Sequence, residues 1–358
     1  MNCLCLKKNL LILFLLFVPV IFIHADDYGV ITGNNVRIRS EASTKSSIAG
    51  ELFKGMKVKI VEEVKGENIL GSEKWYKITH FSFYEEGFVH SKFLALGNEK
   101  EAFLKTFNKN QFDNQLKEIF SAKEIKKINE FEALFQNIKT AEDLEKAFRL
   151  GKKNMDGLSE TLDQYYQKKL SSKKIEEGKL YIGWIIHYLP AHASILVAEG
   201  TTLQFTYFLS DFLEKAKTTK DPVDEKIIQL LIDIYGSVEY YSPSWFMMTW
   251  DYGGDSLLGS GIHLKLLKEI ESLVLSSRLF SQELLEIQKN ILTDIQDSLN
   301  YHETREAIIK EIKQILGEIK LTSEQKKQLE QRLKDFENPK KELNTNCKDY
   351  ENSKCSYG

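Results

Sequence analysis

Apolar positions in the first part of the chain follow a period of two, which is typical of short, half-buried strands. Val36 and Ile38 alternate with Arg37 and Arg39. Further short apolar segments, separated by loops that contain glycine, lie at residues 56–60, 75–78 and 88–94. A series of short strands of this kind predicts a small antiparallel β-barrel over residues 28–97.

Beyond Gly97 the apolar positions change to helical spacing. Residues 308–319, for example, carry isoleucines at intervals of three and four with charged residues between them. Ser281 and Thr322 are the expected N-caps of two helices, and Thr322 with Gln325 forms a capping-box pattern. We therefore expect mainly helices in this part of the chain.

The two patterns together predict a multidomain fold. A small all-β barrel is followed by an all-α irregular helical bundle at residues 99–340 and by a polar C-terminal tail at residues 341–358. The 358 residues are enough for more than one domain and for a sizeable core. With only 5 prolines and 20 glycines, the chain does not belong to the collagen-like or low-complexity classes.

Residues 181–213 form the most apolar stretch that follows the N-terminal region. His187, Pro190, His192 and Glu199 interrupt this stretch, and a lipid-facing helix would carry such residues at considerable cost. We therefore predict that it forms buried central helices of the bundle, not a membrane span. Because His187 and His192 would lie about 140° apart around a helix, interior histidines are favoured over a metal or acid–base pair.

Residues 1–25 have the pattern of a secretory signal peptide. Lys7 and Lys8 form a positive segment, an apolar run extends to Ile23, and the small residue Ala25 precedes two aspartates. The apolar run is shorter than the roughly 20 residues of a membrane-spanning helix. We expect an exported protein of the periplasm or cell envelope, and the alternative is an uncleaved signal that anchors the chain in the membrane.

Charge and motifs argue against several classes of function. The formal net charge is −3, so bulk electrostatics do not draw the chain to nucleic acid. The sequence contains no HExxH, no GxSxG and no recognisable pairing of a nucleophilic cysteine with a histidine. We therefore predict no cofactor and no metal site, and we assign no catalytic residue.

Two cysteines remain once the predicted signal peptide is set aside. Cys347 and Cys355 lie in the polar tail. In an oxidising compartment we expect this pair to close a small disulfide loop, and two free thiols are the alternative. A metal site is disfavoured, because it needs about four ligands and no histidine lies nearby in the sequence.

Four motifs in the barrel segment occur in an informative order, and they read VRIRSEAS, KGMKV, WYKI and GFVHSKFL. Their order and spacing resemble the bacterial SH3-like domain (SH3b, type 3), and the resemblance is limited to residues 28–97. Ala42 stands where that family commonly has proline, and Phe88 stands where it usually has tryptophan. An insertion between Val64 and Trp75 lengthens one loop.

The resemblance implies a binding function, with no chemistry of its own. Domains of this type are usually non-catalytic modules of envelope proteins, and several bind peptidoglycan peptides. An extended peptide would lie in a groove lined by aromatic side chains. The candidate groove residues are Arg39, Glu41, Trp75, Tyr76 and Phe88. For Trp75 and Phe88, a place in the barrel core is the alternative.

A second cluster of aromatic residues, at 235–261, lies among carboxylates and glycines. Aromatic faces beside carboxylates suit a sugar or peptide ligand. The residues of this candidate pocket are Trp245, Trp250, Asp251, Tyr252 and Asp255. The alternative is an aromatic loop between helices that packs on the core.

The sequence favours a non-catalytic binding or scaffolding protein of the cell envelope. Its SH3-like domain would contact peptidoglycan peptide or an envelope protein, with membrane contact only if the signal stays uncleaved. The competing hypothesis is a cell-wall-modifying hydrolase, with its active site in the helical region and the SH3-like domain as a targeting module. A pair of catalytic carboxylates needs no fixed spacing in the sequence, so missing motifs do not exclude an enzyme.

Overall fold

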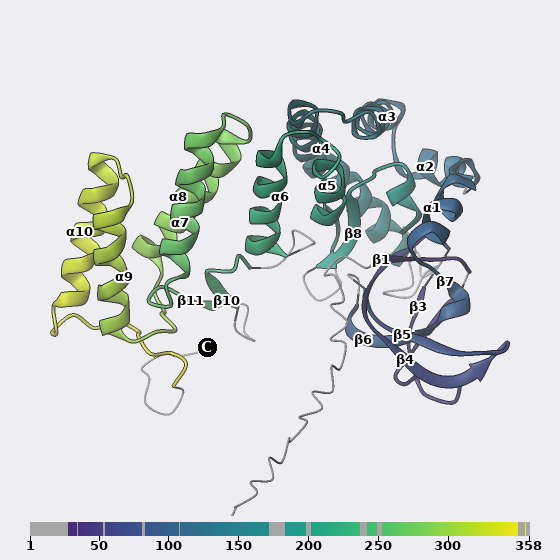
Figure 1. The fold of residues 1–358 in the computed structure, drawn as a ribbon, viewed down its shortest axis with the longest axis horizontal. Helices are drawn as coiled ribbons and strands as arrows, with labels where there is room; N and C mark the ends of the chain where they lie inside the picture. Colours follow the sequence, from purple (N-terminus) through teal and green to yellow (C-terminus); the bar gives the residue numbers. More distant parts are fainter. Residues whose placement is uncertain are drawn as a thin grey trace, which may run out of the picture.

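A computed structural model describes most of the chain after residue 27. The described residues are 28–33, 35–52, 54–80, 83–106, 108–171, 183–197, 202–236, 242–248, 253–349 and 355. The predicted signal peptide at residues 1–25 lies outside them. In the described part a curled antiparallel sheet is followed by ten α-helices (Figure 1). The predicted order, a small all-β unit and then a helical region, is confirmed.

Seven strands form the N-terminal sheet in the order β3-β2-β6-β5-β4-β1-β7, and all their pairings are antiparallel. Their bounds are β1 (Tyr28–Ile31), β2 (Val36–Arg39), β3 (Ile48–Leu52), β4 (Lys57–Ile69), β5 (Ser72–His80), β6 (Phe83–His90) and β7 (Leu94–Ala95). Val36 and Ile38 are buried while Arg37 is exposed, which confirms the predicted alternation in β2. The buried side chains of one face form a core separate from that of the helices.

Strands β4 and β5 form a long hairpin that projects from the rest of the sheet (Figure 1). Its two-residue turn consists of Leu70, with φ of 52°, and Gly71, with φ of 83°. Two left-handed residues are what a type I′ turn requires, and glycine adopts that conformation without strain, whereas leucine does not. This hairpin contains the predicted insertion between Val64 and Trp75.

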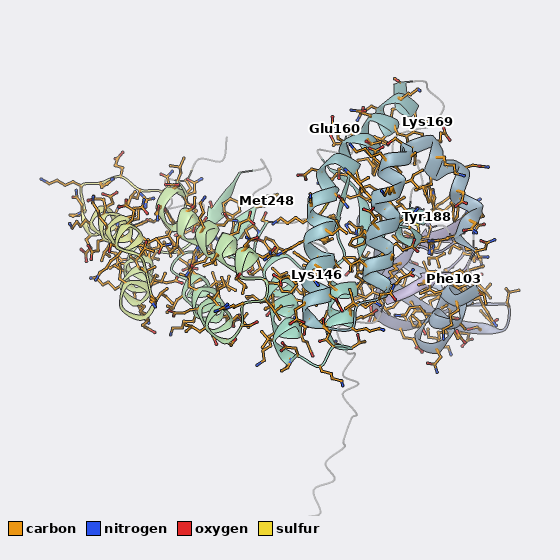
Figure 2. The ribbon with its side chains drawn as sticks, turned by 90° about the horizontal axis from the view of Figure 1, so that it is seen from above. Phe103, Lys146, Glu160, Lys169, Tyr188 and Met248 are labelled. Atoms are coloured by element: carbon orange, nitrogen blue, oxygen red, sulfur yellow. A yellow bond between two sulfur atoms is a disulfide. The ribbon has the colours of Figure 1, made fainter. Side chains whose placement is uncertain are left out.

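Helices begin directly after the last strand of the sheet. The α-helices are α1 (Gly97–Thr106), α2 (Asp113–Ile119), α3 (Ala122–Gln136), α4 (Ala141–Ser171), α5 (Leu209–Ala216), α6 (Pro222–Tyr235), α7 (Ile262–Ser276), α8 (Ser281–Asp297), α9 (Arg305–Glu318) and α10 (Ser323–Glu337). Short 3₁₀ helices are η1 (Ser91–Phe93), η2 (Lys109–Phe112) and η3 (Gly183–His187). Figure 2 shows Phe103 of α1 on the sheet side of the long helix α4, and Met248 on the side of the C-terminal helices.

The C-terminal helices pack as successive pairs that lead away from the sheet (Figure 1). Helix α7 packs against α6, α8 and α9, and α8 packs against α10. The predicted capping box of Thr322 and Gln325 is confirmed at the start of α10. The predicted cap at Ser281 is wrong, because Phe280 precedes that helix with φ of 53° and no side-chain cap. The Phe280 ring is buried against Phe148, so tertiary packing sets this helix start.

The prediction of helices throughout residues 181–213 is wrong. Strands β8 (His192–Val197) and β9 (Thr202–Tyr207) form an antiparallel hairpin there, and β9 packs on α4. Isoleucine, valine, threonine, phenylalanine and tyrosine recur in this segment, and such residues favour strands. In β9 the side chains of Leu203, Phe205, Thr206 and Tyr207 are buried, as predicted for this segment. Within the described residues, the structure contains no helix whose length and hydropathy would allow it to cross a bilayer.

A small sheet joins the ends of the C-terminal helices. Strands β10 (Phe246–Met248) and β11 (Gly254–Ser256) pair antiparallel, and Ser256 forms a parallel bridge to Tyr301. A further parallel bridge joins Asn300 to Asn344 of the tail. In the structure a disulfide links Cys347 and Cys355, with Cα atoms 5.6 Å apart. The tail is therefore attached to the loops that connect the helices.

The sheet contacts the helical region through the strands β1 and β4. Lys57 of β4 donates hydrogen bonds to both carboxylate oxygens of Asp211 on α5, at 2.5 and 2.6 Å. The Lys57 ammonium also lies 5.2 Å from the ring centre of Phe208. Tyr28 packs edge-on against the same ring at 5.0 Å. An ion pair and two aromatic contacts therefore link β1 and β4 to Asp211 and Phe208.

Candidate functional site

A groove of about 260 Å³ lies on the face of the sheet that is turned away from its hydrophobic core. Strands β2, β5 and β6 and the tip of the β4–β5 hairpin contribute to it. The lining residues are Asn35, Val36, Arg37, Arg39, Thr44, Ile69, Trp75, His90 and Phe93. Of the five candidates named from the sequence, Arg39 and Trp75 line this groove.

Trp75 and His90 form the floor of the groove, and each is only 2% exposed. They are directly paired across β5 and β6, and their rings meet edge-on at 5.2 Å. The Trp75 indole N–H donates to the Glu67 carbonyl at 2.9 Å. His90 Nε2 lies 3.1 Å from the Ser72 carbonyl, while Nδ1 accepts from the Lys92 backbone N–H at 3.2 Å. This pattern makes Nε2 the donor and Nδ1 the acceptor, and it holds the two rings of the floor in place.

Two arginines of β2 stand at the edge of the groove. Arg37 and Arg39 alternate with the buried Val36 and Ile38, so both extend from the outer face of the strand. Arg39 donates one hydrogen bond from Nη1 to the Ser46 carbonyl at 2.9 Å, which fixes its direction. The site is therefore positively charged on one side.

The inserted hairpin forms one end of the groove. The Glu67 carboxylate accepts hydrogen bonds from Ser43 Oγ at 2.9 Å, from the Thr44 backbone N–H at 2.5 Å and from Thr44 Oγ1 at 2.7 Å. The hydrogen bonds from Thr44, followed by that from Ser43, lower the pKa of Glu67. Gly66 is needed here, since a Cβ atom would lie 2.3 Å from the Ala42 carbonyl oxygen and 2.7 Å from Trp75 Cδ1. The insertion is thus packed tightly onto the 41–47 loop.

The other three sequence candidates lie outside the groove lining. Tyr76 follows Trp75 in the strand, so its side chain is on the opposite face, in the sheet core. Glu41 is exposed on the loop, and Phe88 is half-buried on β6 opposite Arg39 and Lys77. The structure instead adds Arg37, His90 and Phe93, which the sequence reasoning missed.

All described residues of the groove lining lie in the one segment of the chain that matches a known protein family. Residues 34–95 match the bacterial SH3 domain family. No curated protein and no solved structure matches the chain. The bacterial SH3 domain is a cell-wall- or protein-binding module, and its groove is therefore the first candidate for a binding site in this molecule.

The second candidate pocket is described only in part. Trp250, Asp251 and Tyr252 lie outside the described residues. Trp245 is 4% exposed, and its ring lies edge-on to Tyr235 at 6.4 Å. Asp255 is fully buried, with Oδ2 3.8 Å from His302 Nδ1. These two described members are packed in the interior beside β10 and β11.

A buried polar cluster that the sequence did not reveal lies close to β11. His263 Nε2 is 2.8 Å from Asp294 Oδ2, and the Ser256 hydroxyl donates to the same oxygen at 2.5 Å. Ser298 donates to Asp294 Oδ1 at 2.7 Å. The residue types match a catalytic triad, but a nucleophilic serine must be hydrogen-bonded to the histidine. Here serine and histidine both bind the carboxylate, so the cluster fits a structural role.

Of the two histidines of residues 181–213, His192 is buried and His187 is partly buried. His192 Nδ1 lies 3.0 Å from the Pro190 carbonyl, and its ring packs against Phe131 at 4.8 Å and Tyr207 at 5.1 Å. Burial lowers the pKa of His192 to about 4. Burial, followed by repulsion from Lys57 and Lys109, likewise lowers the pKa of His187 to about 4. Both imidazoles are therefore neutral at physiological pH.

A larger groove, of about 510 Å³, lies between α6 and α7 in the helical region. Leu230 and Leu273 contribute apolar surface, and the acidic residues Glu225, Asp233 and Glu269 stand along it. Among the described residues no cluster of three or more histidine, cysteine, aspartate or glutamate side chains is arranged to hold a metal ion.

Proposed function

We propose that this protein is a non-catalytic binding or scaffolding protein of the cell envelope, and that its bacterial SH3 domain contacts cell-wall peptide or a protein partner. We further propose that the chain is exported through the signal at residues 1–25. The helical region would then provide a second surface and hold the SH3 domain in a fixed position.

This proposal rests on one observation: the segment that matches the bacterial SH3 family also contains the groove. A buried aromatic floor, a basic edge and one exposed aromatic side chain, Phe93, are the features of a site for an extended peptide. The polar groups of the floor are all hydrogen-bonded within the domain, so the groove is held in shape before any ligand arrives.

Co-sedimentation with purified, protein-free peptidoglycan tests the proposal. The chain from Asp26 to Gly358 is expected to sediment with the wall. Phe93→Ala is expected to reduce that binding roughly fivefold, because it removes the exposed aromatic contact. Leu104→Ala on α1 is the matched control, since Leu104 and Phe93 are both 37% exposed and Leu104 lies outside the groove.

The outcomes separate the alternatives. Sedimentation without release of soluble muropeptides supports the binding function. Release of muropeptides by the full chain contradicts the non-catalytic part of the proposal and favours a wall hydrolase. A wild-type chain that stays in the supernatant contradicts wall binding and leaves a protein partner as the ligand of the SH3 groove.

A further inference from the structure

Most polar groups of the SH3 groove already have partners inside the protein. The Trp75 indole N–H is bound to the Glu67 carbonyl, and both His90 nitrogens have backbone partners. The Thr44 hydroxyl donates to the Glu67 carboxylate. A ligand therefore cannot accept a hydrogen bond from these groups without breaking one that the domain uses itself.

The guanidinium groups of β2 are different. Toward the part of the chain that the structure describes, Arg39 donates only from Nη1, to the Ser46 carbonyl, whereas a guanidinium has five N–H donors. Glu51 of β3 stands opposite Arg37, but among the described residues no carboxylate forms an ion pair with Arg37 or with Arg39. Among the described residues that line the groove, none has an acidic side chain. The groove thus presents unneutralised positive charge with donors that are arranged for carboxylates.

The spacing of the two arginines sets the geometry of the ligand. Arg37 and Arg39 are separated by one residue on an extended strand, so their Cα atoms lie about 7 Å apart on one face. Alternate residues of an extended peptide have the same spacing. Two carboxylates carried at alternate positions of such a peptide would each meet one guanidinium.

The size of the groove limits the length of the ligand. Its volume of about 260 Å³ is slightly below the ~300–1,000 Å³ of typical small-ligand sites. A protein–protein interface of standard size buries about 800 Å² on each partner, which this groove cannot supply. Ile69 and Phe93 offer apolar contact beside the charged edge. A peptide of a few residues with one apolar side chain fits these dimensions.

Building on the proposed function, we infer that the SH3 groove binds a short cell-wall peptide through two of its carboxylates, with Arg37 and Arg39 each pairing with one. Phe93 and Ile69 contact an apolar side chain of the peptide that lies between the two carboxylates or next to them. The groove then recognises the charge of the two carboxylates and the distance between them. Neutralising both arginines, or both carboxylates, abolishes this recognition.

Isothermal titration calorimetry tests this inference. The protein is the chain from Asp26 to Gly358, and the first probe is soluble muropeptides that a muramidase has released from purified wall. The same muropeptides with their carboxylates converted to methylamides are the second probe. An N-acetylated, C-amidated Glu-Ala-Glu-Ala peptide is the third, and it represents a protein segment with the same spacing of carboxylates.

The variants are designed to separate charge from fold. Arg37→Gln and Arg39→Gln are each expected to weaken muropeptide binding roughly tenfold, because each removes a charge-assisted hydrogen bond. Arg39→Lys keeps the charge but loses the two-pronged geometry, so its affinity is expected to fall between those of wild type and Arg39→Gln. Arg278→Gln is the matched control, since Arg278 is an exposed arginine between α7 and α8. Circular dichroism checks that each variant is folded.

The results distinguish this inference from the proposed function. The inference is supported if the wild-type chain binds muropeptides strongly and the methylamides weakly, and if the arginine variants lose muropeptide binding. Equal affinity for methylamides, or full binding by the double arginine variant, overturns the inference while wall binding itself stands. Binding of Glu-Ala-Glu-Ala alone overturns the wall source of the ligand. Failure of the wild-type chain to bind muropeptides or intact wall overturns this inference together with the wall-binding part of the proposed function.

Discussion

Glu67 joins two segments of the SH3 domain that are far apart in the sequence. Its carboxylate accepts hydrogen bonds from the Ser43 hydroxyl and from the backbone N–H and hydroxyl of Thr44, and its carbonyl accepts the Trp75 indole N–H. One residue of the insertion therefore fixes both the loop at the end of the groove and the floor. The lowered pKa of Glu67 reflects the hydrogen bonds to its ionised form.

Glu67→Gln is expected to loosen the 41–47 loop, because an amide oxygen is a weaker acceptor and the amide nitrogen faces the Thr44 N–H donor unfavourably. Hydrogen exchange of the Thr44 backbone amide should become faster, with weaker binding in the groove. In the wild type the lowered pKa means that this clamp is intact above pH 4.5 and is lost as pH falls through the folded pKa. Glu73→Gln is the control, since Glu73 lies on the same hairpin and forms an exposed pair with Lys65. Equal exchange in both variants would contradict the role of Glu67.

His192 predicts a dependence of stability on pH. Its folded pKa of about 4 lies below the ordinary value of 6.5, so the unfolded chain binds the proton more readily. The stabilisation is complete above pH 6.5 and is lost progressively as pH falls towards 4. Between pH 6.5 and 5 the free energy of unfolding should fall by about 2 kcal/mol for this residue. Urea unfolding of the wild type and of His192→Gln at both pH values measures this change. If the free energy of unfolding changes between the two pH values by the same amount in His192→Gln as in the wild type, the prediction is wrong.

At the residue scale the sequence could predict part of the groove. The alternation in β2 places Arg37 on the same face as Arg39, so Arg37 could have been found from the strand period alone. The period likewise puts Trp75 and Tyr76 on opposite faces, which is why only one of them lines the groove. His90 and Phe93 could not be assigned in this way, because their positions depend on pairing of β6 with β5 and on the short helix η1.

The turn of the β4–β5 hairpin is an element whose sequence does not suit its conformation. Leu70 adopts a left-handed conformation at 77% exposure, whereas a type I′ turn favours asparagine before glycine. Leu70→Asn is expected to raise the free energy of unfolding by about 1 kcal/mol, because leucine in this region carries a steric cost of about 1–2 kcal/mol. Urea unfolding measures the change.

Ile48→Asn is the matched control for the turn. Ile48 is 50% exposed on β3 and has no positive φ. This variant is expected to be neutral or destabilising, because asparagine is unfavourable in a strand. A gain in stability of the same size in both variants would show that lower surface hydropathy, not backbone strain, is responsible. If Leu70 is retained to contact a partner, Leu70→Asn should also weaken binding in the neighbouring groove.

At the element scale the sequence predicted the sheet and most helices but not the hairpin β8–β9. A run of apolar residues such as 181–213 lacks a clear period, so its length favoured helices. Its strands are defined by contacts that are distant in sequence. The Leu203 and Phe205 backbone N–H groups of β9 donate to Asp163 and Ser159 of α4, at 2.9 and 3.0 Å. Such long-range hydrogen bonds are invisible to local patterns.

The whole molecule consists of a binding domain fixed at one end of a row of helices (Figure 1). The contact is formed by Lys57, Asp211, Phe208 and Tyr28, whose side chains do not line the SH3 groove. Docking of the SH3 domain therefore leaves its groove open to a ligand. Gly55 adds to this fit, since a Cβ atom there would lie 2.4 Å from His187 Nε2. A ligand bound in the groove would consequently hold the helical region in one orientation.

Asp211→Asn tests whether the two regions behave as one unit. Lys57 and Asp211 are 20% and 15% exposed, so removal of the carboxylate leaves a largely desolvated ammonium without its partner. The free energy of unfolding should fall by about 2 kcal/mol, and the SH3 domain should separate from the helices at lower urea concentration than in the wild type. Glu214→Gln is the matched control on the same helix, because its contact with Lys100 is 4.0 Å long and Glu214 is 56% exposed. Urea unfolding followed by small-angle scattering measures both quantities. Equal effects of the two variants would mean that the Lys57–Asp211 pair does not dock the domain.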